Sequence, residues 1–312
     1  MEIKAKILVV GSIFMDMVAT MPCFPQDSET VMGSHFFTAA GGKGANQAVQ
    51  ASRLGADVTM VGKVGGDVFA EQILSVMRES GVNTDFIKIS PDTFTGVGTI
   101  QIEKKEDKVT NRICVIPGAN MEIMLEDVGF LEEEIKKYDM VILQMEIPLE
   151  INAFVAALAK KHGVPVMLNP APYAPIPDAL LSCITYISPN ECEASKLSGT
   201  EVKDVESAGE AIKVLCKKGI KNVIVTLGSQ GAVFGNDTGY EFYPSVFSGE
   251  CVDPTAAGDS FVGAFCSCVC SGYDEKDAMK FANTVASLTV TGLGAMPSLP
   301  DMEKVKKYGG KK

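Results

Sequence analysis

Short apolar runs alternate with longer amphipathic segments along most of the chain. The run Ile7–Val10 ends at Gly11 and is typical of a buried parallel strand. Further strands are predicted at Val58–Val61, Met140–Gln144, Val164–Leu168, Thr185–Ile187 and Asn222–Thr226. This alternation predicts an α/β fold with a mostly parallel central sheet flanked by helices.

The amphipathic segments between these runs carry helix start and stop signals. Asp67 and Gly81 delimit a helix over Phe69–Ser80, and Gly163 ends a helix over Leu149–Lys161. The remaining helices are predicted from Gly41–Ala48 to Gly55, around Glu191–Leu197, over Val205–Lys218, and from Asp259 to Gly272.

Two stretches interrupt the alternation with β-type patterns. In one, Thr30–Met32 and His35–Phe37 predict short strands; in the other, Gly96–Ile102 and Val109–Val115 flank a charged turn at Glu103–Lys108. We expect a small inserted β lid of residues 13–40 and 94–116, on an α/β core of residues 1–12, 41–93 and 117–312. Such a sheet could serve as a lid, a dimer surface, or both.

Composition narrows the possible partners and chemistry. The 312 residues carry a formal net charge of −11, which argues against nucleic acid or an anionic membrane as partner. No apolar run approaches the ~20 residues of a membrane span, and the first residues do not resemble a signal peptide. Nine cysteines without a Cys-x-x-Cys pair indicate buried thiols in a reducing cytoplasm rather than disulfides. Since His35 and His162 are the only histidines, we expect carboxylates to carry out any acid–base catalysis.

The stretch Val252–Phe261 combines a small-residue turn with a carboxylate at a helix start. The turn ends at Gly258, and Asp259 opens a long apolar helical pattern. Amide groups at a helix N-terminus bind anions, and a neighbouring carboxylate can accept a proton. Phosphoryl transfer to an alcohol needs both groups. The alternative is an N-capping aspartate after an ordinary turn.

The stretch Gly41–Ala48 places paired glycines before a helix. It is not the phosphate-binding G-x-x-x-x-G-K-[ST] motif, because Gly44 follows the lysine. The glycines let a ligand approach the backbone, and Asn46 offers both a donor and an acceptor. A hydroxyl-rich ligand fits this combination, although a glycine-rich cap without a ligand is an alternative.

Polar residues follow most of the predicted strands. Since the carboxyl ends of parallel strands meet at one edge of a sheet, they predict an active site there. They are Gly11–Asp16, Glu146, Asn169, Asn190 with Glu193, and Thr226–Ser229.

In order and spacing, these motifs resemble the ribokinase family of sugar kinases over nearly the full length. The resemblance rests on Gly41–Ala48, Asn190-Glu191-x-Glu193, Thr226–Gly231, Asp253-x-Thr255–Asp259 and Gly294-Ala295-x-Pro297-Ser298. It implies an α/β core with a β lid that is commonly shared across a homodimer. It also implies ATP and Mg²⁺, often with a monovalent cation such as K⁺ as activator.

The resemblance also assigns roles by position. It implies Asp259 as general base and Ala256, Ala257 and Gly258 as an anion hole. The implied sugar contacts are Asp16, Gly42, Lys43, Asn46 and Glu146. The implied nucleotide contacts are Asn190, Thr226, Gly228, Ser229, Gly231, Gly258 and Asn283, with Asn190 and Glu193 in the motif tied to Mg²⁺. The implied monovalent-cation loop contains Asp253, Thr255, Thr289, Gly292, Gly294 and Ser298, much of it acting through backbone carbonyls.

Ordinary structural roles remain alternatives at several of these positions. Asn283 could lie on the surface of an amphipathic helix, and Thr289 and Ser298 could be capping or turn residues. Glu146, close to Pro148, could be an acid at a helix start.

Phe14 departs from the family pattern. Ribokinases usually carry Asn two residues before the sugar-binding Asp, and an unpaired sugar hydroxyl against a phenyl ring would cost ~1–3 kcal/mol. Deoxyribokinases resemble ribokinases but have an apolar residue here, and they tend to have Gly near Val290–Gly292, as in this chain. Thus 2-deoxyribose competes with ribose as the expected substrate.

The expected activity is ATP-dependent phosphorylation of the terminal hydroxymethyl of a pentose, ribose to ribose 5-phosphate. The alternatives are a 2-deoxyribose kinase, then another ribokinase-family sugar or nucleoside kinase. Residues 18–40 contain no Lys or Arg, which argues against a sugar-phosphate acceptor. A dehydrogenase would need G-x-G-x-x-G where Gly11–Phe14 stands. A sugar-binding protein without catalytic activity would have no need of a carboxylate beside an anion hole.

Overall fold

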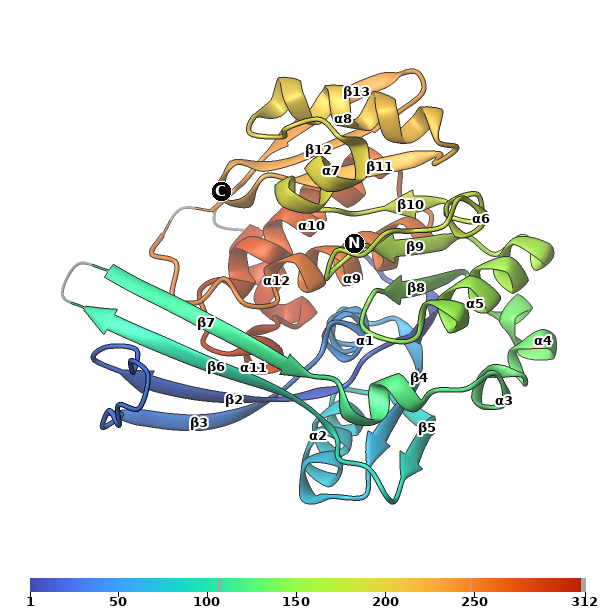
Figure 1. The fold of residues 1–312 in the computed structure, drawn as a ribbon. Coiled ribbons are helices and arrows are strands. Elements are labelled where there is room, and N and C mark those ends of the chain that lie inside the picture. Colours follow the sequence, from blue (N-terminus) through green and yellow to red (C-terminus); the bar gives the residue numbers. More distant parts are fainter. Residues whose placement is uncertain (106–107, 248, 310–312) are drawn as a thin grey trace.

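The computed structural model describes residues 1–105, 108–247 and 249–309, and its centre is a nine-stranded sheet (Figure 1). The strand order is β13-β12-β11-β10-β9-β8-β1-β4-β5, parallel from β11 to β5, with β12 and β13 antiparallel at the edge. The bounds are β1 Lys6–Val10, β4 Asp57–Gly65, β5 Asn83–Ser90, β8 Met140–Gln144, β9 Val166–Asn169, β10 Tyr186–Ile187, β11 Asn222–Thr226, β12 Gly231–Asn236 and β13 Gly239–Pro244. The predicted α/β class with a mostly parallel sheet is confirmed.

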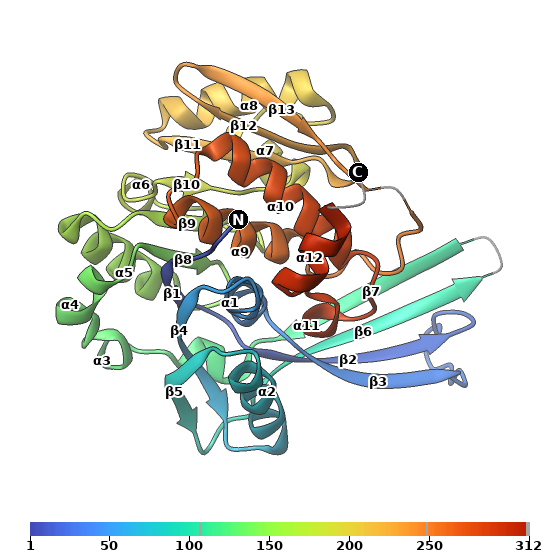
Figure 2. The same ribbon diagram turned by 180° about the vertical axis from the view of Figure 1, so that it is seen from behind.

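Helices cover both faces of this sheet, so its central strands are buried on two sides. On one face lie α1 (Lys43–Arg53), α2 (Val68–Glu79), α9 (Ala257–Cys270), α10 (Glu275–Thr289) and α12 (Met302–Gly309) (Figure 2). On the other lie α3 (Leu125–Val128), α4 (Leu131–Glu134), α5 (Leu149–His162), α6 (Asp178–Leu181), α7 (Glu191–Ser198) and α8 (Val205–Lys217). The short segments are η1 (Gly118–Glu122), η2 (Ile135–Lys137), η3 (Gly228–Gln230) and α11 (Ala295–Ser298). None of the helices in the described ranges is long and apolar enough to cross a bilayer.

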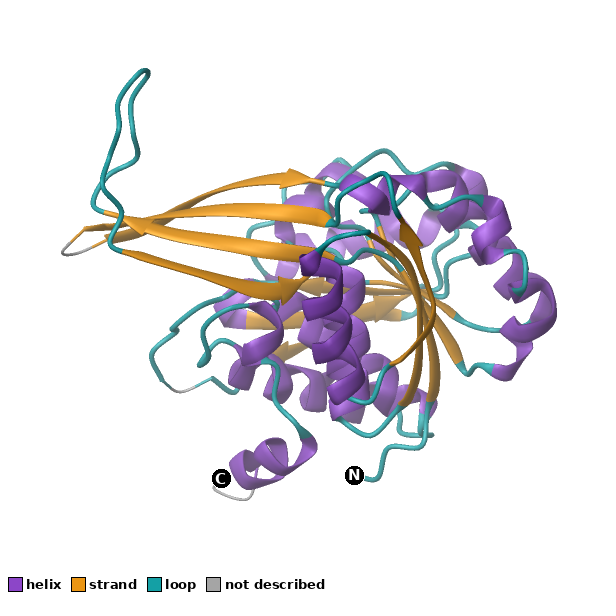
Figure 3. Ribbon diagram, turned by 90° about the horizontal axis from the view of Figure 1, so that it is seen from below, coloured by secondary structure: helices purple, strands orange, loops and turns teal. Residues whose placement is uncertain are grey.

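A second, four-stranded sheet projects from the main body (Figure 3). Its order is β3-β2-β6-β7, with bounds β2 Phe14–Met21, β3 His35–Gly41, β6 Gly96–Lys105 and β7 Lys108–Ile116. Asn120 ties its start to η1, because the Asn120 Nδ2 donates to the carbonyl of Ile13 and its Oδ1 accepts from the amide of Ile13, both at 2.8 Å. The small separate sheet was predicted; the exact domain boundaries stay a prediction.

Details of this sheet differ from the sequence expectation. The strand predicted at Thr30–Met32 is wrong: this segment lies in a loop, and Met32 is 84% exposed with no neighbouring strand. The strand is instead Phe14–Met21, which pairs with both β3 and β6 and was not predicted. The predicted turn at Glu103–Lys108 is shorter than expected, since residues to Lys105 belong to β6 and Lys108 opens β7. Its residues 106 and 107 lie outside the described residues.

Three strands of the central sheet were not predicted: β5, β12 and β13. β5 and β13 are the edge strands, where one face is exposed and the apolar run is broken, and β12 lies between β13 and β11. Of the cysteines on α9, Cys266 and Cys268 are buried and Cys270 is half-buried, as isolated thiols.

Candidate active site

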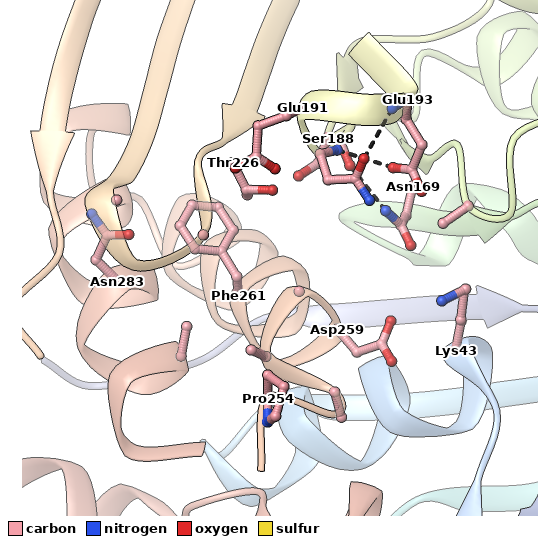
Figure 4. A pocket seen from close by; sticks show the side chains of 18 residues that line it. Lys43, Asn169, Ser188, Glu191, Glu193, Thr226, Pro254, Asp259, Phe261 and Asn283 are labelled. Carbon is pink, nitrogen blue, oxygen red and sulfur yellow. Dashed lines mark hydrogen bonds between the residues drawn. The ribbon is translucent and has the colours of Figure 1, made fainter. Parts of the chain in front are cut away.

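Two adjoining cavities lie beyond the carboxyl ends of the central strands. The larger, of about 340 Å³, lies between α7, β11 and the start of α9. The smaller, of about 130 Å³, lies under the four-stranded sheet. Lys43, Ala256 and Asp259 line both cavities and mark their junction. In Figure 4 the side chains of Lys43 and Asp259 face each other there, one from α1 and one from α9.

Asp259 is held in this junction by two amide side chains. Its Oδ2 accepts a hydrogen bond from Asn46 Nδ2 and its Oδ1 one from Gln47 Nε2, both at 2.9 Å. The alternative role as N-cap is wrong, because Ala256 occupies the cap position of α9 and Asp259 lies within its first turn. Asp259 is 7% exposed and lines both cavities.

The turn before Asp259 presents backbone amides to the junction. Ala256 has φ of 62°, a left-handed conformation that is uncommon for a residue with a side chain. The amide of Ala257 donates to Pro254 O at 3.2 Å and closes the turn. Within the described residues, the amides of Ala256 and Gly258 donate to no acceptor. Two of the three implied anion-hole amides are therefore free.

Asp16 projects from β2 between two glycines of neighbouring strands. A Cβ on Gly41 or Gly98 would lie 2.4 or 2.5 Å from an oxygen of the Asp16 carboxylate, so a side chain at either position would displace this carboxylate. Burial, and next the nearby Glu146 and Asp259, raise the pKa of Asp16 to about 7.

Glu146 organises the glycine-rich turn before α1. Its Oε2 accepts hydrogen bonds from Ser12 Oγ at 2.5 Å and from the backbone amide of Lys43 at 3.2 Å. Burial raises the pKa of Glu146. Glu146 precedes α5 rather than starting it, so the alternative of a helix-start acid is wrong. Gly42 has φ of 94°, and a side chain is excluded at this position because a Cβ would lie 2.8 Å from Phe14 N.

The Lys43 side chain lies among carboxylates. Burial opposes its charge, but the surrounding anions, first Asp259 and then Glu146, outweigh burial and raise the pKa of Lys43. The ammonium therefore stays charged at the junction of the cavities, where negative charge on a transferred group would develop.

The small cavity has a polar floor and an apolar wall. Among the described residues, the buried Oδ1 of Asn46 accepts no hydrogen bond. A buried acceptor without a donor is costly unless a ligand supplies one. The wall is formed by Phe14, Ile100, Ile113 and Val115 of the four-stranded sheet. This combination suits a small polyol with one apolar face.

Eight of the 18 residues that line the large cavity are Gly, Ala or Ser. Thr226, Gly228, Gly231 and Asn283 line it as implied, whereas Ser229 is exposed and lies outside its lining. Asn283 is not a surface residue: it is buried, and its Nδ2 donates to the carbonyls of Tyr243 and Pro244 at 3.0 and 3.3 Å.

Asn190 and Glu193, at the rim, form the capping box of α7. The Oδ1 of Asn190 accepts from the amide of Glu193 at 2.9 Å, and Glu193 Oε2 accepts from the amide of Asn190 at 3.0 Å. Burial raises the pKa of Glu193, whose side chain lines the large cavity.

The implied cation loop is organised by Asp253. Its Oδ1 accepts from the amide and hydroxyl of Thr255 at 2.9 and 2.6 Å, and its Oδ2 accepts from the amide of Gly294 at 2.9 Å. The hydroxyls of Thr289 and Ser298 donate to backbone carbonyls of their own helices, as the structural alternative expects. A Cβ on Gly292 would lie 2.8 Å from the Ser298 side chain. No group of three or more His, Cys, Asp or Glu in the described residues could hold a metal, so a cation here would depend on carbonyl oxygens.

Two functional residues, Gln47 and Gln144, were not predicted from the sequence. They are hydrogen-bonded to each other, and Gln47 is hydrogen-bonded to Asp259. Gln144 Nε2 donates to Gln47 Oε1 at 2.7 Å, and both side chains are fully buried. Polar residues at core-facing positions of an apolar helix are the signal that could have found Gln47.

Comparison with known proteins gives consistent matches over the whole chain. The model of the pfkB family of carbohydrate kinases matches residues 4–302. The chain is 37% identical to a ribokinase of Haemophilus influenzae, covering 98% of each chain. It is 35% identical to a deoxyribokinase of Salmonella typhi, covering 97% of this chain and 98% of the other. The solved structure of Arabidopsis thaliana ribokinase complexed with ribose and ATP superposes with a TM-score of 0.90, at 34% identity over 97% of this chain and 98% of that one.

Proposed function

Since the chain belongs to the pfkB family of carbohydrate kinases and is a sugar kinase of the ribokinase type, we propose that it transfers the γ-phosphate of ATP to the 5-hydroxyl of ribose. The observation that carries the proposal is the junction at which Lys43, Ala256 and Asp259 line both cavities. A phosphoryl donor in the large cavity and an alcohol in the small one would meet there. The Arabidopsis relative, solved with ribose and ATP, supports this pair of substrates.

Ribose occupies the small cavity in this proposal. Its ring hydroxyls donate to the Asp16 carboxylate and to the free Oδ1 of Asn46, while Phe14 and Ile100 cover the ring. The 5-hydroxymethyl group then points toward Asp259. Closing the four-stranded sheet over the sugar would exclude the water that otherwise hydrolyses ATP.

Asp259 accepts the proton of the 5-hydroxyl as the sugar oxygen forms its bond to the γ-phosphorus. The bond from that phosphorus to the β–γ bridging oxygen breaks, and ADP leaves with the electron pair. The free amides of Ala256 and Gly258, with the Lys43 ammonium, stabilise the charge on the transferred group. Positioning supplies much of the rate acceleration.

Mg²⁺ and K⁺ belong to the proposal as accessory ions. Mg²⁺ usually binds through one or two carboxylates together with substrate phosphates, and Glu191 and Glu193 line the large cavity. There it would neutralise phosphate charge. The segments around Asp253–Thr255 and Gly292–Ser298 would hold K⁺ through backbone carbonyls, because the Asp253 oxygens are already bonded to loop amides.

A homodimer through the four-stranded sheet is also proposed. Besides the side chains that line the small cavity, this sheet exposes the large apolar side chains of Phe36 and Ile116. Light scattering during size-exclusion chromatography should give twice the chain mass. A monomer at micromolar concentration would contradict it. A cytoplasmic location stays a prediction.

A 2-deoxyribose kinase is the second candidate, favoured by Phe14. Its ring lines the small cavity and packs over Gly96, where a Cβ would lie 2.8 Å from the ring. A hydroxyl facing this ring would lack a partner at a cost of ~1–3 kcal/mol. The deoxyribokinase relative of Salmonella typhi is consistent with this alternative.

A coupled ADP-release assay tests the proposal. It compares ribose, 2-deoxyribose, arabinose, fructose and nucleosides, with and without K⁺. We expect the highest kcat/KM with ribose and a lower rate without K⁺. A higher kcat/KM for 2-deoxyribose would favour the second candidate, and sugar-independent ADP release would contradict both.

Replacing Phe14 with Asn separates the two candidates further. The amide can pair with a sugar hydroxyl, so Phe14→Asn should shift the ribose to 2-deoxyribose ratio of kcat/KM about tenfold toward ribose. Phe14→Leu, which stays apolar, is the matched control. An unchanged ratio in Phe14→Asn would show that this ring does not face the sugar hydroxyl.

A further inference from the structure

We propose that Gln47, locked by Gln144, is a positioning residue that holds the Asp259 carboxylate in the orientation needed to accept the substrate proton. The inference rests on the proposed function, because it acts through Asp259 as the base. Gln47 lines neither cavity, so it acts without touching either substrate.

Hydrogen bonds of Gln47 connect Asp259 to the carboxyl ends of strands β8 and β9 of the central sheet. The fully buried Gln47 donates from Nε2 to Asp259 Oδ1 at 2.9 Å and toward Asn169 Oδ1 at 3.3 Å. Its Oε1 accepts from Gln144 Nε2 at 2.7 Å. Each end of this amide therefore has its own partner.

These partners allow only one orientation of the Gln47 amide. Turned over, its oxygen would face the oxygens of Asp259 and Asn169, and its NH₂ would face the NH₂ of Gln144. The contacts would then be repulsive and the hydrogen bonds lost. Asn169 is itself fixed, because its Nδ2 donates to Ser188 O at 2.9 Å.

The supporting amides come from a rigid part of the fold. Gln144 and Asn169 are paired at the ends of the neighbouring strands β8 and β9. Gln144 also lies against Gly11, where a Cβ would be 1.9 Å from its Oε1. The absence of a side chain at Gly11 thus makes room for Gln144.

The consequence concerns the two oxygens of Asp259. Asn46 holds Oδ2 but also faces the sugar cavity, so its contact can change when the sugar binds. Gln47 holds Oδ1 from the side away from both cavities. It gives the carboxylate a fixed orientation in the free and bound enzyme alike.

Other charged groups face Asp259, and their influence has to be separated from that of Gln47. They are Lys43 on α1, Asp16 on β2, Glu146 after β8 and Glu193 on α7. All of these charged groups are retained in a Gln47 variant. A difference in kcat between this variant and the wild type is therefore due to the loss of the Gln47 amide.

The test replaces Gln47 with Leu and uses Gln50→Leu as the control. Gln50 lies on the same helix, is equally buried, and donates from Nε2 to Pro300 O at 2.9 Å, away from Asp259. For Gln47→Leu we expect kcat to fall roughly 10- to 100-fold, with the sugar KM changed less than about threefold. Gln50→Leu should keep the wild-type kcat and the wild-type sugar KM.

A second variant keeps the inference testable if Gln47→Leu folds poorly. Gln144→Leu leaves the Gln47 donor in place but removes the hydrogen bond that fixes the orientation of the Gln47 amide. We therefore expect kcat to fall about 3- to 10-fold. The double variant should be no slower than Gln47→Leu alone, because the two residues act as one unit. Thermal denaturation of each variant reports folding separately from catalysis.

Asp259→Asn in the same assay separates the inference from the proposed function. If it abolishes turnover while Gln47→Leu behaves like Gln50→Leu, the positioning role is wrong and the base assignment stands. If Asp259→Asn retains turnover, the base assignment fails and the inference fails with it. A fall in kcat of Gln47→Leu accompanied by an equally large rise in the sugar KM would also overturn the inference.

Discussion

The two cavities of this sugar kinase are lined by different kinds of residues. The small one is lined by functional side chains from separate segments, including Asp16, Lys43, Asn46 and Glu146. In the large one, eight of the 18 lining residues are Gly, Ala or Ser, among them Gly228, Gly231 and Gly258, against three of 13 in the small one. Side chains can discriminate among hydroxyl patterns, whereas backbone amides suit phosphates, which are the same in every nucleotide.

This difference predicts how each side responds to substitution. On the sugar side, a single change removes a charge or a hydrogen bond that no neighbour replaces. On the nucleotide side, most contacts survive a change of side chain because the backbone makes them. The effects should be greatest at the junction, smaller in the sugar cavity and smallest in the nucleotide cavity.

The largest effect is expected for Asp259→Asn at the junction. An amide cannot accept the proton, so kcat should fall about 10²- to 10⁴-fold while sugar affinity by isothermal titration calorimetry changes only a few-fold. The similar shape of Asn limits any change in packing. A kcat within about tenfold of wild type would refute the role of Asp259 as base.

Lys43→Met should come next, because Lys43 lines both cavities. Removing its charge takes away stabilisation of the transferred group and should lower kcat about 10²-fold. Lys43→Arg is the charge-matched control and should recover part of the rate. If only the sugar KM changed, Lys43 would belong to the sugar cavity rather than to the junction.

Asp16→Asn should act on the sugar side alone. Above pH 7, where Asp16 is ionised, loss of this charged acceptor should raise the sugar KM about 10- to 100-fold and leave the ATP KM unchanged. Steady-state kinetics with each substrate varied in turn would show this. An equal rise in both KM values would contradict the separation of the cavities.

The raised pKa of Asp16 also predicts a pH dependence. In the folded protein Asp16 keeps its proton up to about pH 7, against 3.8 for the ordinary group. Between these values the folded state holds a proton that the unfolded state has lost. The free energy of unfolding therefore falls as pH rises through this window. Asp16→Asn should remove this contribution, as denaturant titrations at several pH values would show; an unchanged slope would contradict it.

Asn283→Leu should give the smallest effect. Its amide donates to the Tyr243 and Pro244 carbonyls and supports the cavity wall. We expect the ATP KM to rise less than about tenfold and the sugar KM to stay constant. A loss as large as that of Asp16→Asn would show that the nucleotide side also depends on individual side chains.

The same contrast explains what the sequence could predict. The buried apolar runs of β1 and β8 and the motifs at Asp259 and Lys43 were visible because their chemistry depends on residue type. The strand Phe14–Met21 was not visible, since Asp16 breaks its apolar pattern and its pairing with β6 lies far along the chain.

Contacts that depend on backbone geometry or on the orientation of a side chain could not be predicted from the sequence, because residue type alone does not determine them. The bond from the Ala257 amide to Pro254 follows from a turn geometry that residue types do not determine. Gln47 and Gln144 are 97 positions apart, and only the fold brings their amides together. The exposure of Ser229, which the family pattern places at the nucleotide, likewise depends on the local path of η3.

The most direct test of phosphate transfer across this junction is ³¹P nuclear magnetic resonance of the reaction with ATP and ribose. Transfer to the 5-hydroxyl predicts ADP and one phosphomonoester in equal amounts, with its phosphorus split into a triplet by the two C5 protons. Phosphorus coupled to a single ring proton, or free phosphate in place of the ester, would contradict the account.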